Sequence, residues 1–119
     1  GVDLRKPLTP QEAIDIESGM DKYAVLIFHG QDITDEQQLA FALNFGEREK
    51  ARGGTVTKKE DYRLTTGLND VSNLGKDGKP LSRDHRTHLF NLGNRLWHSD
   101  SSFRPIPVKF SLLSARVVN

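Results

Sequence analysis

The first helical pattern of polar and apolar positions opens on a capping signature. In residues 9–12 (TPQE), Thr9 can cap a helix, Pro10 suits its first turn, and Glu12 completes a capping box. Apolar residues follow at helical spacing along one modest stripe. The pattern therefore predicts a helix over residues 10–21.

A second helix is predicted by the same signals further along. Residues 34–37 (TDEQ) repeat the capping signature, and Gly46 is a typical residue just beyond a helix end. The apolar face expected for this helix consists of Leu39, Ala42, Leu43 and Phe45.

Three segments have the pattern of strands. Residues 23–28 form a short, continuously apolar run rich in β-branched and aromatic side chains, which predicts a buried strand. Residues 71–74 predict a short strand before a reversal at 76–80, where Asp-Gly is a strong turn signal. Residues 108–118 predict a longer strand. Because helices and strands do not alternate regularly as in a nucleotide-binding fold, the sequence predicts one α+β, mainly β unit.

Composition narrows the class of protein. The 119 residues carry a formal charge of +1, which gives no general attraction to nucleic acid, and the longest apolar run is too short to cross a membrane. No cysteine is present, so any metal must be held by nitrogen and oxygen ligands. The lack of cysteine also suits the reducing cytoplasm, where we expect the protein to act.

Candidate chemistry centres on residues 94–103 (NRLWHSDSSF). In an extended chain, residues i and i+2 point to the same side, so His98 and Asp100 can reach one ion. Imidazole and carboxylate together suit iron(II), manganese or zinc, and a site of two histidines and one carboxylate leaves positions open for substrates.

Two other interpretations of these residues stay open. With 4 His and 10 Asp in the chain, chance alone gives about one third of a His-x-Asp pair, so His98 can be a structural histidine and Asp100 a turn residue. Alternatively, His85 and His88 with His98 or Asp100 form a zinc site in a self-contained, non-catalytic metal-binding or interaction module.

Several landmarks, in order, resemble the iron(II)- and 2-oxoglutarate-dependent dioxygenases of the 2,4-dichlorophenoxyacetate/taurine dioxygenase family. They are residues 1–5 (GVDLR), 24–31 (AVLIFHGQ), 39–46 (LAFALNFG) and 96–103 (LWHSDSSF). Three further segments resemble the branch that cleaves 2,4-dichlorophenoxyacetate: residues 71–73 (VSN), 77–79 (DGK) and 110–115 (FSLLSA).

The resemblance implies part of a double-stranded β-helix, or jelly roll, with N-terminal helices packed on the sheet. It makes His98 and Asp100 catalytic metal ligands and implies Fe(II), 2-oxoglutarate and O2 as cofactor and co-substrates. The family's third ligand, a distal histidine, and the arginine that anchors 2-oxoglutarate have no counterpart in these residues. Residues 1–119 are thus expected to be the N-terminal portion of a single, incomplete domain.

The resemblance also implies a reaction. Hydroxylation of a small anionic substrate, such as 2,4-dichlorophenoxyacetate, gives a phenol and glyoxylate while 2-oxoglutarate becomes succinate and CO2. The expected partner is therefore a small organic anion, with neither nucleic acid nor membrane, and assembly into a homo-oligomer stays open.

Four side chains are candidates for contacting the substrate, and two others for lining its pocket. Asn94 matches a substrate-contacting family position, Ser101 and its neighbour Ser102 can donate hydrogen bonds to substrate or to Asp100, and a lysine can meet the substrate's charge. The lysine candidates are Lys79 and Lys58, and we expect Trp97 and Phe103 to belong to the core or to the pocket wall.

Overall fold

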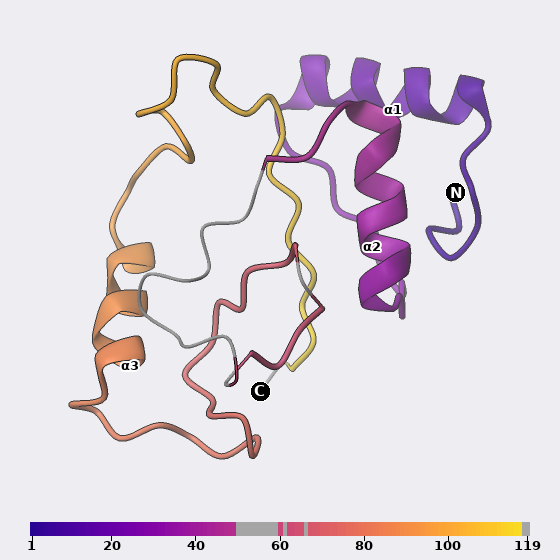
Figure 1. Ribbon diagram of the computed structural model, residues 1–119. Helices are drawn as coiled ribbons and strands as arrows, with labels where there is room; N and C mark the ends of the chain where they lie inside the picture. The colour runs from indigo at the N-terminus through magenta and orange to yellow at the C-terminus, as the bar shows by residue number, and fades with distance from the viewer. Residues whose placement is uncertain (50–59, 61, 66, 118–119) are drawn as a thin grey trace. The chain divides into compact units, whose positions relative to one another are not determined.

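The structure, a computed structural model, describes residues 1–49, 60, 62–65 and 67–117 (Figure 1). It separates into two compact parts, one made of Gly1–Arg48 with Ser114–Asn119 and the other of Glu49–Leu113. Helices are the regular elements of both parts. None of the helices in the described residues is long and apolar enough to cross a membrane.

Helix α1 (Pro10–Tyr23) confirms the first predicted helix. Thr9 Oγ1 accepts a hydrogen bond from the Glu12 amide at 3.2 Å, and the Glu12 carboxylate accepts one from the Thr9 amide at 2.8 Å. Together these bonds satisfy two amides that the first turn leaves without helical partners. The helix ends at Ala24, which takes a left-handed conformation with φ 63°.

Helix α2 (Asp35–Ala42) continues as the short 3-10 helix η1 (Leu43–Phe45) and confirms the second predicted helix, but not its face. Thr34 and Gln37 form the capping box, and Gly46 ends the element at φ 125°. The expected apolar face is wrong at its centre, because Phe41 is buried whereas Leu43 is 58 % exposed.

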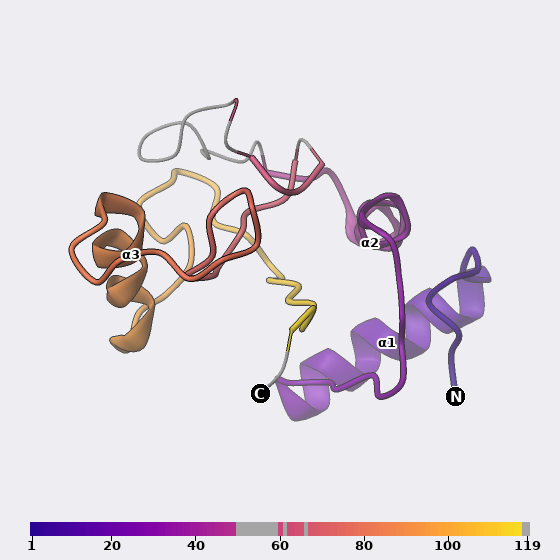
Figure 2. The same cartoon turned by 90° about the horizontal axis from the view of Figure 1, so that it is seen from below.

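A small apolar core holds the first part together. Its buried members are Leu4, Ile16, Ile33 and Phe41. The Phe41 ring lies edge-to-face between Phe28, at 5.9 Å between centroids, and Phe45, at 5.2 Å. Figures 1 and 2 show α2 running across α1, so the core joins two helices and the segments that flank them.

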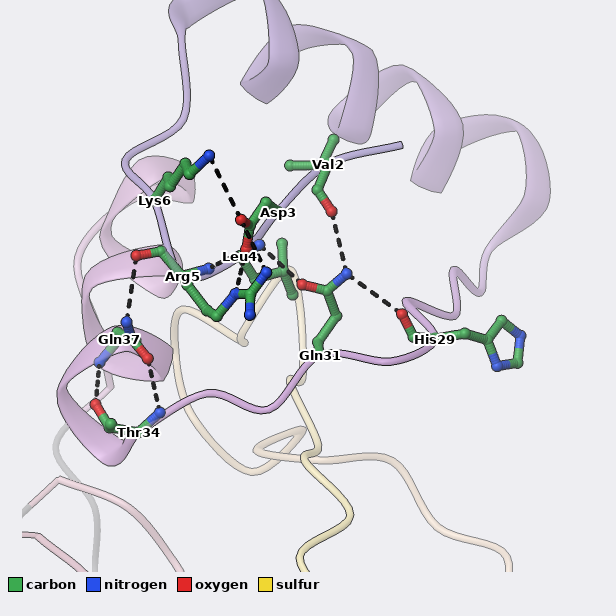
Figure 3. A network of polar contacts seen from close by, with 9 residues as sticks. All are labelled: Val2, Asp3, Leu4, Arg5, Lys6, His29, Gln31, Thr34 and Gln37. Atoms are coloured by element: carbon green, nitrogen blue, oxygen red, sulfur yellow. Dashed lines mark hydrogen bonds and ion pairs between the residues drawn. The ribbon is translucent and has the colours of Figure 1, made fainter.

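The N-terminal segment is fixed by one glutamine side chain (Figure 3). Gln31 Oε1 accepts from the Leu4 amide at 2.9 Å, and Gln31 Nε2 donates to the Val2 carbonyl at 3.1 Å. This pairing resembles that of a neighbouring strand, because it satisfies both a donor and an acceptor of the backbone. It holds Leu4 over the core.

The prediction of a buried strand at residues 23–28 is wrong, because the segment forms no regular strand and its side chains alternate between the core and solvent. Leu26 and Phe28 pack against the core, whereas Val25 and Ile27 are 69 % and 73 % exposed. A strand needs a neighbour to pair its amides and carbonyls, and within the described residues no ladder forms along this segment. Gly19 of α1 permits the close packing, since a Cβ there would lie 3.2 Å from Leu26 Cδ1.

The second part contains a tight reversal where Asp-Gly predicts one. The Gly75 amide donates to the Lys79 carbonyl at 2.8 Å, and Gly78 has φ 76°, a conformation that favours glycine. The strand expected at residues 71–74 is wrong, because the described structure there holds one isolated antiparallel bridge between Leu74 and Pro80. A single bridge is too short to count as a strand.

Helix α3 (Arg86–Asn91) and the 3-10 helix η3 (Leu92–Arg95) were not predicted. Asn91 Nδ2 donates to the Ser72 carbonyl at 2.6 Å and so ties the end of α3 to the preceding loop. The same loop is closed by a two-bond ion pair between Arg63 and Asp70, at 2.7 and 3.1 Å. The hydrogen bonds to the Asp70 carboxylate raise the pKa of the Arg63 guanidinium.

The strand expected at residues 108–118 is also wrong within the described part of it, residues 108–117. Side chains near it remain uncovered, with Ile106 84 % and Leu113 87 % exposed. A sandwich strand is stabilised by a paired edge and a covered apolar face, and the described residues supply neither here. The helical half of the expected fold is therefore confirmed, whereas its sheet is not present among these residues.

Candidate metal centre

The candidate ligands follow directly after η3. Leu96 ends this helix with φ −90° and ψ 146°, and its amide donates to the Gly93 carbonyl at 3.1 Å. Residues 97–99 lie in neither helix nor turn, and a turn begins at Asp100. The short helix thus ends in an extended residue, Leu96, two positions before His98.

His98 and Asp100 point toward one another. His98 Nε2 lies 3.3 Å from Asp100 Oδ1, and the two side chains are 47 % and 55 % exposed. His98 Nδ1 lies 2.7 Å from the Leu96 carbonyl oxygen, which can only accept, so Nδ1 carries a hydrogen. In the neutral imidazole this leaves Nε2 with a free lone pair facing the carboxylate.

This arrangement fits a divalent metal ion. Two lone-pair atoms at 3.3 Å repel each other unless a cation or a proton lies between them. A metal bound by nitrogen and oxygen at about 2.1 Å separates adjacent ligands by about 3 Å, close to the distance observed. The second nitrogen of a metal-binding histidine usually donates to a carbonyl or carboxylate, as Nδ1 does to Leu96.

The outer oxygen of Asp100 has a partner that the sequence did not suggest. Ser111 Oγ donates to Asp100 Oδ2 at 2.5 Å. The expected donation from Ser101 to Asp100 is wrong, because the Ser101 hydroxyl donates to Glu49 instead. The sequence places Ser101 and Ser102 directly after Asp100, whereas the observed donor lies eleven residues further along the chain.

Glu49 holds the turn that follows Asp100. Its carboxylate accepts from Ser101 and forms an ion pair with Arg104, whose amide donates to the Ser101 carbonyl at 3.0 Å. Ser101 lies in the left-handed region at φ 52°, which is uncommon for a residue with a side chain. Two separate contacts therefore support this region: Glu49 holds the turn after Asp100, and Ser111 holds the Asp100 carboxylate.

The expected substrate-contacting residues are placed as follows. Asn94 is exposed in η3, four residues before His98, and Lys79 is exposed in the turn that Gly78 closes. Ser101 keeps its lone pairs, although its hydrogen is used by Glu49. Lys58 lies outside the described residues.

The expected burial of the neighbouring aromatic side chains is wrong within the described residues. Trp97 is fully exposed and Phe103 is 69 % exposed. Arg104 lies 5.9 Å from the Phe103 ring centroid, which is a weak cation–π contact at most. Among the described residues, neither ring is therefore part of a buried core.

The alternative zinc site is not supported. His85 caps α3, where its Nδ1 accepts from the Thr87 amide at 3.2 Å. Throughout the part of the chain that the structure describes, no three histidine, cysteine, aspartate or glutamate side chains are grouped to hold a metal. The interpretation built on His85, His88 and His98 therefore loses its geometric basis.

Comparison with known protein families assigns the chain that carries the His-x-Asp pair to one family. Residues 1–119 match the family described as "Taurine catabolism dioxygenase TauD, TfdA family", and the chain belongs to it. The resemblance inferred from the ordered landmarks is confirmed.

Two members of this family have sequences similar to that of the chain. It is 44 % identical over 119 residues to the alpha-ketoglutarate-dependent 2,4-dichlorophenoxyacetate dioxygenase of Cupriavidus pinatubonensis, covering 98 % of this chain and 40 % of the relative. Identity falls to 31 % over 102 residues with the (S)-phenoxypropionate/alpha-ketoglutarate-dioxygenase of Delftia acidovorans, covering 82 % and 30 %.

A solved structure is more similar still. The crystal structure of AAD-2 in complex with Mn(II) and N-oxalylglycine is 83 % identical, with a TM-score of 0.91, over all of this chain and 41 % of that one. The chain therefore spans between 30 % and 41 % of the length of these relatives.

Proposed function

We propose that the protein carrying this chain is an iron(II)- and 2-oxoglutarate-dependent dioxygenase that hydroxylates a small anionic aryloxyacetate such as 2,4-dichlorophenoxyacetate. The observation that carries the proposal is the convergence of His98 Nε2 and Asp100 Oδ1, 3.3 Å apart, in a chain of this family. The higher identity to the dichlorophenoxyacetate enzyme than to the phenoxypropionate enzyme favours an aryloxyacetate.

The proposed cofactors follow from the same comparisons. N-oxalylglycine, bound with Mn(II) in the AAD-2 structure, differs from 2-oxoglutarate by an NH in place of one methylene, so it is a stand-in for that co-substrate. Bound iron(II) supplies the redox chemistry that couples decarboxylation of 2-oxoglutarate by O2 to hydroxylation of the substrate. The atoms balance when one oxygen enters succinate and the other enters the hydroxylated product.

His98 and Asp100 have distinct tasks in this proposal. The hydrogen bond from Nδ1 to the Leu96 carbonyl holds the imidazole in the tautomer whose Nε2 can bind metal. Asp100 Oδ1 adds a negative charge beside it and thereby favours a cation at this point. The partner ligand, a distal histidine, would come from residues other than these.

The products follow from the chemistry of the substrate. Hydroxylation of the methylene between the ether oxygen and the carboxylate gives a hemiacetal, which breaks its carbon–oxygen bond to yield a phenol and glyoxylate. The substrate carboxylate needs a cationic partner, for which Lys79 and Lys58 remain candidates, and Asn94 and Ser101 remain candidates for polar contacts.

The same proposal includes the architecture of the whole protein. Residues 1–119 form the N-terminal portion of one jelly-roll dioxygenase domain, whose sheet would cover side chains such as Val25, Ile27 and Trp97. Cytoplasmic location and assembly into a homo-oligomer remain predictions.

The test uses the whole protein and two readouts. With iron(II), ascorbate and O2, we expect CO2 release from 2-oxoglutarate and formation of 2,4-dichlorophenol from 2,4-dichlorophenoxyacetate. His98→Ala and Asp100→Ala should each lower both rates by at least about 100-fold, because each removes a metal ligand. Thermal unfolding should change little, because both side chains are about half exposed.

Matched controls lie in the same chain. His29→Ala removes an exposed imidazole that points away from its polar network (Figure 3), and Asp21→Ala removes an exposed carboxylate near the end of α1. Both should keep wild-type rates. No turnover by metal-loaded wild type, or full turnover by His98→Ala, would refute the proposal.

A further inference from the structure

The second oxygen of the Asp100 carboxylate is committed to a hydrogen bond. Ser111 Oγ donates to Oδ2 at 2.5 Å, while Oδ1 lies 3.3 Å from His98 Nε2. The two oxygens of one carboxylate thus face different partners. A short hydroxyl-to-carboxylate bond of this kind is charge-assisted and stronger than a neutral hydrogen bond.

We infer that Ser111 is a positioning residue that restricts Asp100 to binding the metal through Oδ1 alone. The inference rests on the proposed function, since it assigns a task beside the proposed metal ligands. A carboxylate can bind a metal through one oxygen or through both, and rotation about its Cβ–Cγ bond interconverts these modes. The Ser111 hydroxyl opposes this rotation because it holds Oδ2 in a hydrogen bond of its own.

Restricting the carboxylate has a consequence for co-substrate binding. A metal ion bound by two imidazoles and one carboxylate oxygen would leave positions open for a chelating oxo acid and O2. Asp100 bound through both oxygens would take up one of these positions. Ser111 would therefore keep the site open for the co-substrates.

Other hydroxyl groups near Asp100 do not duplicate this contact as far as the structure describes them. The Ser101 hydroxyl donates to Glu49, and that carboxylate is also paired with Arg104. The turn after Asp100 therefore has its own support. Ser111 can be altered without removing it.

The experiment compares two substitutions of equal shape at position 111. Ser111→Thr keeps the hydroxyl, and Ser111→Val replaces it with a methyl group in the same outline. Ser111→Ala removes the hydroxyl without adding volume, and Ser18→Ala makes the same chemical change at an exposed position of α1. Folding of each variant of the whole protein is checked by circular dichroism and thermal unfolding.

The probe is Mn(II) alone, with free Mn(II) measured by electron paramagnetic resonance during titration. We expect Ser111→Val and Ser111→Ala to bind Mn(II) about 10-fold to 100-fold more weakly than wild type, because Asp100 loses the hydrogen bond that holds its carboxylate in place for the ion. Ser111→Thr and Ser18→Ala should stay within about 3-fold of wild type, the range we allow for small repacking effects. If one valine or alanine variant does not fold, the other, compared with threonine, decides the question.

The outcomes separate this inference from the proposed function. Wild-type affinity in folded Ser111→Val or Ser111→Ala would overturn the role of the hydroxyl, as would equal loss in the threonine and valine variants. The proposed function fails separately, if wild type binds no Mn(II) or if His98→Ala binds it as tightly as wild type. A second titration with N-oxalylglycine present should show the same order of variants.

Discussion

Replacing Phe41 by alanine tests the packing that holds α1 and α2 together. The Phe41 side chain is 9 % exposed and contacts the rings of Phe28 and Phe45 edge-to-face, at 5.9 and 5.2 Å. Burial of a phenylalanine side chain contributes about 2–3 kcal/mol, and each aromatic contact adds about 0.5–1 kcal/mol. We therefore expect Phe41→Ala to lower the free energy of unfolding by about 3–5 kcal/mol, as for other buried Phe→Ala changes.

The assay is equilibrium unfolding of the whole protein in urea, followed by circular dichroism. Phe41→Leu keeps most of the apolar volume but loses both ring contacts, so it should cost about 1–2 kcal/mol. Leu43→Ala is the matched control because Leu43 is adjacent in sequence and 58 % exposed, and it should cost less than about 1 kcal/mol. Equal losses for Phe41→Ala and Leu43→Ala would refute the assigned core.

Two further predictions concern the N-terminal segment. Thr9→Ala removes the acceptor of the capping box and should lower the free energy of unfolding by about 1 kcal/mol, whereas Thr9→Ser should be nearly neutral; equal losses in urea unfolding would contradict the box. Hydrogen bonds from Arg5 lower the pKa of Asp3 from 3.8 to about 2. The folded-state pKa lies below the unfolded one, so this pair's contribution is present above pH 3.8 and is lost as the pH falls toward 2. In NMR titration, Arg5→Ala should return the pKa of Asp3 toward 3.8, and an unchanged pKa would argue against the ion pair.

Local signals account for the elements that could be predicted. Both capping boxes involve residues three apart, so Thr9 with Glu12 and Thr34 with Gln37 are visible in the sequence before any tertiary contact is known. The reversal closed by Gly78 is equally local, since it depends on the conformational freedom of one residue. These features need no information from distant parts of the chain.

The strand predictions were wrong because a strand depends on contacts with distant parts of the chain. Residues 23–28 have the composition of a strand and even its alternation, with Leu26 packed inward and Val25 turned outward. A ladder, however, depends on a partner whose position the local pattern does not contain. The same holds for residues 108–117, whose apolar side chains find no covering sheet among the described residues.

In the candidate site, too, local features could be predicted from the sequence and contacts between distant residues could not. The His-x-Asp spacing predicts that His98 and Asp100 share one side of an extended chain, and the structure brings their side chains to within 3.3 Å of each other. Ser111 could not be found this way, since it reaches Asp100 only after the chain turns back over eleven positions. Helix α3 was missed because His85 caps it through a ring nitrogen, outside the usual set of Ser, Thr, Asp and Asn.

The central claim is that His98 and Asp100 bind one metal ion together, and anomalous diffraction tests it most directly. Crystals of the whole protein grown with Mn(II) should show one anomalous peak within about 2.0–2.3 Å of both His98 Nε2 and Asp100 Oδ1. A peak that touches only one of these atoms, or a fully loaded ion bound elsewhere, would contradict the account.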